Sequence, residues 1–196
     1  MTTKVEIVPA VDDDAAALVD LFAESSGGVL PAVWEVSATP SETLESAGKR
    51  ALVTTNKGLC VANTVIARAG DALLGAMCCY EESPTDAFAD ALPASLQKTL
   101  SLFSSLHVPN SWFIAELCCR TEARGRGVGT ALLHHAMAQA ETQQLPQLSL
   151  RVFSANTAAI RLYQRLGFTV RDERALVPHP RMSVKGSVYA MVRDLG

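Results

Sequence analysis

The chain has 196 residues, of which 48% are hydrophobic and 19% carry charge, a composition typical of a globular protein with one core. No apolar run approaches the roughly 20 residues that a membrane-spanning helix needs, and the N-terminus lacks the apolar segment of a secretion signal. The net charge of −3 gives no overall attraction to nucleic acid or to an acidic membrane. We therefore expect a single domain over residues 1–196, in the cytoplasm, with no nucleic-acid or membrane partner.

The N-terminal part predicts a strand followed by helices. Lys4–Pro9 alternates as a strand does, and aspartates at 12–14 offer N-caps to a helix over Ala15–Ala23. Ser25–Gly28 ends that helix. Pro31–Lys49 then predicts a second helical region, broken near residue 40 by a proline.

The middle of the chain predicts a hairpin and then an insertion. Leu59–Arg68 and Leu73–Tyr80 are rich in β-forming residues and flank the turn Ala69-Gly70-Asp71. An insertion over about 81–110 follows, acidic at first and then helical over Ala94–Leu106.

The last third of the chain alternates between strand and helix patterns. Trp112–Cys119 predicts a strand, Val128–Gln143 an amphipathic helix, and Pro146–Phe153 a second strand. Asn156–Leu166 predicts another helix, which Gly167-Phe168 ends before a further strand.

The five cysteines fall in apolar, strand-like runs, as Cys60 and the pairs Cys78-Cys79 and Cys118-Cys119. Adjacent residues of a strand point to opposite faces, so neither pair forms a ready chelate or an easy disulfide. The sequence has no C-x-x-C spacing of the kind that zinc sites use. We therefore expect reduced core cysteines and no metal.

The run Arg124-Gly125-Arg126-Gly127-Val128-Gly129-Thr130 lies where a predicted strand gives way to a predicted helix. Glycines there let backbone amides approach a ligand closely, and the helix adds its unpaired N-terminal amides and its dipole. This combination binds phosphate. Because the net charge is negative, the local arginines, among them Arg120, indicate an anion site rather than a broad basic surface. The alternative is a flexible surface turn.

The spacing Arg124-x-x-Gly127-x-Gly129, followed by Asn156 and by Leu162-Tyr163-x-x-Leu166-Gly167-Phe168, resembles the GNAT superfamily of N-acetyltransferases, most specifically over residues 112–170. The resemblance implies an α/β fold of the α+β kind, with a mixed, mostly antiparallel sheet and helices on both faces. The sheet would be splayed between strands 4 and 5, here Trp112–Cys119 and Pro146–Phe153. It also implies an acetyl-CoA-dependent N-acetyltransferase, with acetyl-CoA as cosubstrate in the splay and no metal.

The resemblance also implies which residues contact acetyl-CoA. The amides of residues 125–130 would hold its pyrophosphate, and the backbone of residues 117–119 would pair with its pantetheine arm like an added strand. Asn156 would bond the pantetheine or serve as a plain helix N-cap. The candidate acetyl-CoA-binding residues are Leu117, Cys118, Cys119, Arg124, Gly125, Arg126, Gly127, Val128, Gly129, Thr130 and Asn156.

Two residues are candidates for catalysis. Tyr163 matches the family tyrosine near the sulfur and would protonate the departing thiolate; the alternative is a core aromatic. Glu116 is the one carboxylate in an otherwise apolar strand and is the candidate base; the alternative is a carboxylate that faces solvent or pairs with an arginine. The amide of Cys119 would stabilise the developing oxyanion. Because Cys118 and Cys119 lie in a hydrophobic run, we expect direct transfer in a ternary complex rather than an acetyl-cysteine.

The expected acceptor is a small-molecule primary amine, with walls formed by Ser26–Lys49, residues 81–110 and Leu176–Gly186. The acidic residues between 81 and 86 would attract a cationic amine or form a solvated loop. A homodimer is left open. Two alternatives are a non-catalytic acyl-CoA sensor and a protein or peptide N-terminal acetyltransferase. A dinucleotide-binding enzyme is disfavoured because the chain has Gly125-x-Gly127-x-Gly129 rather than Gly-x-Gly-x-x-Gly.

Overall fold

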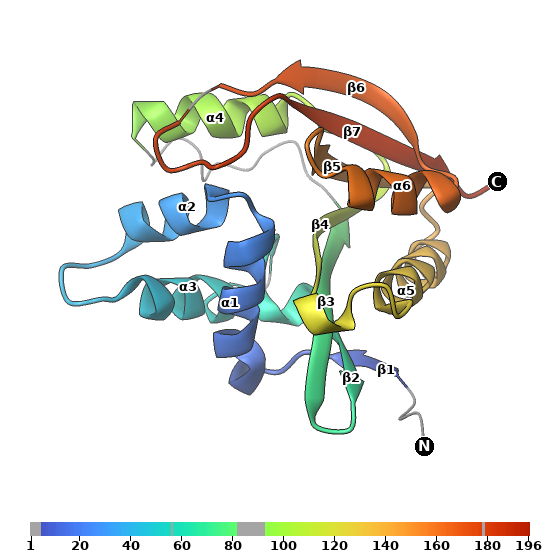
Figure 1. The fold of residues 1–196 in the computed structure, drawn as a ribbon, viewed down its shortest axis with the longest axis horizontal. Helices are drawn as coiled ribbons and strands as arrows, with labels where there is room; N and C mark the ends of the chain where they lie inside the picture. The colour runs from blue at the N-terminus through green and yellow to red at the C-terminus, as the bar shows by residue number, and fades with distance from the viewer. Residues whose placement is uncertain (1–4, 56, 82–92, 178) are drawn as a thin grey trace.

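The computed structural model describes residues 5–55, 57–81, 93–177 and 179–196, and its strands form a seven-stranded mixed sheet in the order β1-β2-β3-β4-β5-β7-β6 (Figure 1). β4 and β5 are parallel, and the other neighbouring pairs are antiparallel. This confirms the expected fold class. The strands are β1 Glu6–Pro9, β2 Thr64–Ala69, β3 Ala72–Glu81, β4 Ser111–Cys119, β5 Gln147–Phe153, β6 Thr169–Ala175 and β7 Ser187–Asp194. The helices are α1 Ala15–Ser25, α2 Val29–Ser37, α3 Leu44–Val53, α4 Ala94–Ser104, α5 Val128–Thr142 and α6 Thr157–Arg165.

Most predicted elements are confirmed to within a few residues, and the break near residue 40 separates α2 from α3. The expectation of a strand from Leu59 was wrong, because the strand begins at Thr64. Before it, the side chain of Asn63 donates to the Gly58 carbonyl at 2.8 Å and that of Thr64 to the Cys60 carbonyl at 2.7 Å. Such local bonds favour a turn over an extended chain, and residues 61–63 form a 3-10 helix.

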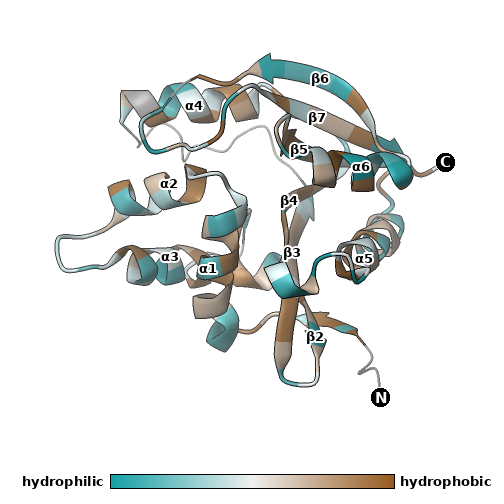
Figure 2. Ribbon diagram, in the orientation of Figure 1, coloured by the Kyte–Doolittle hydropathy of each residue, from teal (hydrophilic) through white to brown (hydrophobic). Residues whose placement is uncertain are grey.

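Helices cover both faces of the sheet. α1, α2 and α3 pack on one face, and α5 and α6 pack on the other (Figure 1). As expected, Cys78 and Cys118 belong to the core beneath α1–α3, whereas Cys79 and Cys119 lie on the side of α5. β3 and β4 are apolar for most of their length because both of their faces are covered, whereas the edge strand β6 is mostly hydrophilic (Figure 2). None of the helices in the described ranges is long and apolar enough to cross a membrane.

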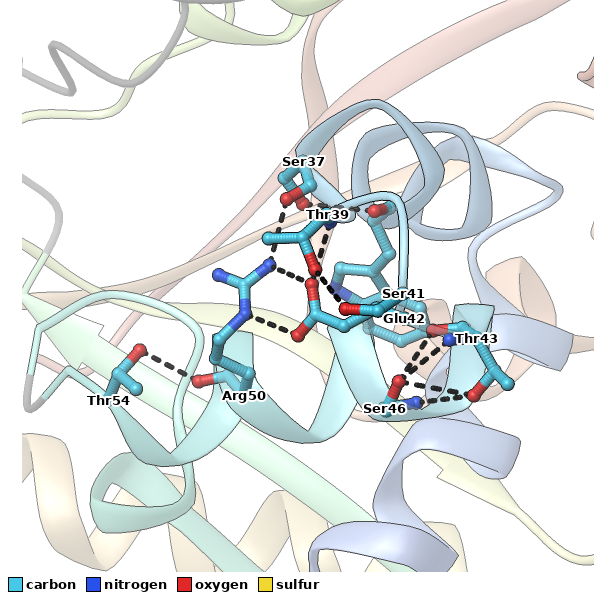
Figure 3. Close-up of polar contacts among 9 residues, drawn as sticks. Ser37, Thr39, Ser41, Glu42, Thr43, Ser46, Arg50 and Thr54 are labelled. Atoms are coloured by element: carbon cyan, nitrogen blue, oxygen red, sulfur yellow. Dashed lines mark hydrogen bonds and ion pairs between the residues drawn. The ribbon is translucent and has the colours of Figure 1, made fainter.

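A polar cluster fixes the turn between α2 and α3 (Figure 3). Arg50 donates to both carboxylate oxygens of Glu42, at 2.7 and 3.0 Å, and to the Ser37 carbonyl at 2.8 Å. The bond from Arg50, with help from the amide of Thr39, lowers the pKa of Glu42 to about 2. The Thr43 hydroxyl caps α3 by accepting from the amide of Ser46 at 3.1 Å. The cluster holds α2 against α3, and α2 supplies part of the cleft described below.

The loop between β6 and β7 docks on the turn between α1 and α2. The amide of Ser183 donates to the Gly27 carbonyl at 3.2 Å, and Arg181 forms an ion pair with Glu35. Gly28 has a φ of 95°, and a Cβ there would collide with the Arg181 carbonyl. This contact brings the C-terminal half of the chain against the N-terminal helices.

Gly75 on β3 permits close pairing with β4, because a Cβ at this position would lie 2.6 Å from the carbonyl oxygen of Cys118. We predict that Gly75→Ala destabilises the fold by about 2–3 kcal/mol, as overpacking against backbone does. Urea denaturation measures the effect. Gly70→Ala is the control, since its Cβ meets nothing within 4 Å and only its φ of +60° is unfavourable. Equal losses in the two variants would contradict the prediction.

Candidate active site

A cleft of about 850 Å³ opens where β4 and β5 separate. The two strands pair over Ser111–Ile114 and Gln147–Leu150, and their pairing ends there although both strands continue. The predicted splay is therefore present. The predicted site residues in its lining are Leu117, Cys118, Cys119, Arg124, Gly125, Gly127, Val128, Gly129, Thr130, Asn156, Glu116 and Tyr163. Arg126 is exposed and lies outside this lining.

A bulge in β4 decides where Glu116 points. Cys78 of β3 pairs with Glu116 and Cys79 pairs with Ile114, so Ala115 is an extra residue. In a regular strand, residues 114 and 116 would share one face. With the bulge, Ile114 packs in the core beneath α5, whereas Glu116 faces α1.

Glu116 is a half-buried carboxylate with one hydrogen-bond donor from α1. The hydroxyl of Ser25 donates to its Oε2 at 2.8 Å. Burial raises the pKa of Glu116 to about 7, and the bond from Ser25 opposes this rise. The group is thus a carboxyl that exchanges its proton near neutral pH. The sequence left open that Glu116 pairs with an arginine instead, but no such ion pair is present in the described part of the chain.

Tyr163 lies on the inward face of α6 and is 6% exposed. Its ring is 5.8 Å from that of Phe168 between centroids. Burial, followed by the charge of Glu116, raises its pKa above the usual value. The phenol therefore keeps its proton at neutral pH and borders the cleft as a potential donor.

The exposed edge of β4 carries backbone groups that β3 does not use. The amide of Arg120 donates to the Leu74 carbonyl at 2.8 Å. Since bonding directions alternate along an antiparallel strand, Cys118 also bonds toward β3, and Leu117 and Cys119 point their backbone groups toward the splay. The candidate backbone contacts for a ligand are thus Leu117 and Cys119, because the backbone of Cys118 is used in pairing with β3.

The glycine run forms an open surface at the start of α5. Gly125 and Gly127 have φ values of 72° and 83°, and a Cβ on either would meet nothing within 4 Å. The first helical bond runs from the amide of Ala131 to the Gly127 carbonyl at 2.9 Å, so the amides of residues 128–130 precede the bonded ladder. Bare backbone and free-pointing amides of this kind suit a phosphate group.

Two other predicted residues make contacts within the protein. Arg124 donates to Glu24 at 2.8 Å, and both side chains are more than half exposed, at 58% and 53%. This pair joins the glycine run to the end of α1. Asn156 accepts from the amide of Ala159 at 3.2 Å, so it serves as the N-cap of α6 while it also borders the cleft.

The thiols beside the site are poorly suited to ionise. Burial raises the pKa of Cys119, against an opposing effect of Arg124, and burial likewise raises that of Cys118. A thiol in such surroundings is a weak nucleophile at neutral pH.

Sequence reasoning missed the role of Ser25, which it took only as part of a helix end. No local signal marks it, because its partner lies 91 residues away. It also missed an apolar wall formed by Tyr80, Phe103 and Phe113, which line the same cleft. Of the acidic residues expected to attract an amine, Glu81 is exposed and outside the lining, and Glu82 and Asp86 fall outside the described residues.

Comparisons with known proteins show the family and the fold of the chain. A model of the acetyltransferase (GNAT) family matches residues 32–168. Mycothiol acetyltransferase of Thermobispora bispora is 50% identical over 48 residues, which is 24% of this chain and only 16% of that relative. An N-acetyltransferase structure from Staphylococcus aureus Mu50 has a TM-score of 0.68 at 18% identity and covers 95% of this chain and 99% of its own. A mosquito arylalkylamine N-acetyltransferase like 5b has a TM-score of 0.69 at 15% identity and covers 98% and 100%. At these identities the structures show a shared fold.

We predict that Ser25→Ala raises the pKa of Glu116 further above 7, because the carboxylate loses a hydrogen bond that favours its charged form. A carbon-detected NMR titration of the glutamate carboxyl groups measures it. Ser26→Ala is the matched control, since the Ser26 hydroxyl bonds to the Ala23 carbonyl and not to Glu116. An unchanged or lowered pKa in Ser25→Ala would refute this account of the carboxyl.

Proposed function

The chain belongs to the acetyltransferase (GNAT) family, whose members use acetyl-CoA, and we propose that it transfers an acetyl group to a primary amine of a small molecule. The observation that carries the proposal is one cleft that combines a glycine run at a helix N-terminus, a strand edge that no neighbouring strand uses, a carboxyl with a pKa of about 7 and a protonated phenol. Acetyl-CoA would supply the acetyl group already activated as a thioester.

The described residues fit the cosubstrate chemically. The amides of residues 125–130 would bind its pyrophosphate, with each charge-assisted bond contributing about 1.5–3 kcal/mol. The backbone of Leu117 and Cys119 would pair with the amides of the pantetheine arm. Arg124 would turn toward the phosphates or remain with Glu24, and the exposed Arg126 would add only long-range attraction.

Glu116 would accept the proton of the acceptor amine, directly or through one water. Its pKa of about 7 leaves it partly ionised at neutral pH while making it a stronger base than an ordinary carboxylate. Ser25 would act as a positioning residue, because its hydroxyl holds one carboxylate oxygen and leaves the other for the proton.

Cys119 and Tyr163 would stabilise the negative charges that develop on the thioester carbonyl and on the departing thiolate. The Cys119 amide, directed into the splay, would donate to the oxygen of the thioester carbonyl as negative charge develops there. The phenol of Tyr163 would give its proton to the departing thiolate. We propose direct transfer from thioester to amine, which the raised pKa values of Cys118 and Cys119 support.

We predict that Glu116→Gln and Tyr163→Phe each lower kcat by about 10²-fold or more while the dissociation constant of acetyl-CoA changes little, as expected for groups that move protons. In the unaltered protein, kcat/KM should rise with pH through about 7 as Glu116 loses its proton. That limb should disappear in Glu116→Gln. Steady-state kinetics with a panel of amines, and calorimetry with acetyl-CoA, measure these quantities.

The same measurements separate an enzyme from a binding module. An acyl-CoA sensor would be favoured if acetyl-CoA binds tightly, no amine is acetylated, and neither Glu116→Gln nor Tyr163→Phe changes any of the measured quantities. A stable acetylated protein that disappears in Cys119→Ala would instead overturn direct transfer.

We also predict that Gly127→Ala weakens acetyl-CoA binding by about ten-fold or more, because a methyl group would stand on the surface offered to the pyrophosphate. Gly70→Ala is the control, with a similar positive φ on a remote turn. Calorimetry measures both variants, and circular dichroism checks that each is folded. Equal affinities of the two variants for acetyl-CoA would show that the pyrophosphate does not bind at this loop.

A further inference from the structure

The cleft has two chemically different sides, because it passes through the sheet where β4 and β5 separate. The glycine run, Tyr163 and the edge of β4 lie on the side of α5 and α6. Glu116 faces the other side, toward α1. That second side, which we call the apolar side, is lined by Leu30 of α2, Tyr80 of β3, Leu100 and Phe103 of α4, and Phe113 of β4.

Aromatic rings on the apolar side are held by edge-to-face contacts. Tyr80 and Phe113 are 5.6 Å apart between centroids, at an interplanar angle of 78°. Phe103 and Phe153 are 6.2 Å apart at 79°. Rings fixed in this way form a wall that receives a flat apolar group with little loss of side-chain freedom.

The charges of the lining argue against a second ammonium group. Within the described part of the lining, the carboxylates are Glu24 and Glu116. Glu24 is paired with Arg124, and Glu116 is the proposed base. A basic group on this side is Arg151, whose guanidinium lies 4.5 Å from the centre of the Phe113 ring. A polyamine or an aminoglycoside would bring several positive charges to this cationic and apolar wall, where the described lining offers no further carboxylate to pair with them.

We propose that the acceptor is a monoamine with an apolar, ring-sized body: the amine would lie at Glu116 and the body against Tyr80, Phe103 and Phe113. This inference rests on the proposed function, since it concerns the acceptor side of the same cleft. Burial of the apolar body would supply binding free energy. Glu116 would remove the single positive charge of the amine by accepting its proton.

The test is calorimetry of amines with the protein saturated by CoA. We expect 2-phenylethylamine to bind at least ten-fold more tightly than ethylamine, which lacks the apolar body, and than spermidine, which carries additional charges. Equal or tighter binding of ethylamine or spermidine, or no binding of 2-phenylethylamine, overturns the inference.

Two variants locate the bound amine. Phe103→Ala should weaken 2-phenylethylamine about ten-fold, a usual cost for part of an apolar pocket, and leave ethylamine unchanged. Leu102→Ala is the matched control, because it is half-buried on the same helix and packs on the same cluster but lies outside the cleft lining. Equal losses in the two variants would place the ligand elsewhere and overturn the inference.

Failure of the inference is distinct from failure of the proposed function. Absence of acetyl-CoA binding, measured first and without any amine, would refute the transferase. Acetyl-CoA binding together with acetylation of spermidine in preference to 2-phenylethylamine would leave the transferase intact and refute only the acceptor class.

Discussion

The separation of β4 from β5 is the constraint on which the site depends. A sheet normally satisfies its backbone groups strand by strand, yet here the pairing stops after Ile114 and Leu150 in the middle of seven strands. Backbone groups left unpaired inside a protein each cost about 1–3 kcal/mol. Such a gap is therefore tolerated where solvent or a ligand with its own amides completes the bonding, which is the property that a pantetheine arm offers.

The bulge at Ala115 connects this backbone feature to the chemistry. By turning Glu116 toward α1, it removes a carboxylate from the α5 side of the sheet and brings it to Ser25, in the same cleft as the apolar wall. The arrangement has a cost in stability. The pKa of about 7 in the folded protein exceeds the unfolded value of 4.5, so the folded state loses stability as pH rises from about 4.5 to 7. A carboxyl group that is retained although it lowers the stability of the fold is more consistent with a chemical role than with a structural one.

Features that depend on neighbouring residues could be predicted from the sequence. The glycine run before α5, the Asn156 cap and the opposite faces of the paired cysteines follow from local geometry. Features that depend on distant contacts could not. An alternating pattern does not reveal an inserted residue in β4, so it could not show that Glu116 meets Ser25. The strand β7 was likewise not predicted. It pairs with β5 and β6, which precede it in the chain, and this pairing is not signalled by a short turn in the sequence.

The two sides of the cleft also affect how Glu116, a base of modest strength, could deprotonate an alkylamine. An amine with a pKa near 10.4 in water and a carboxylate with a pKa of about 7 differ by more than three units, an unfavourable proton transfer of roughly 4–5 kcal/mol. An apolar environment lowers the pKa of an amine just as it raises that of a carboxyl, because both charged forms lose water. The pKa of about 7 already includes the effect of burial on Glu116, so the aromatic wall would narrow the remaining gap by lowering the pKa of the amine. Binding an apolar amine and deprotonating it would then be parts of one effect.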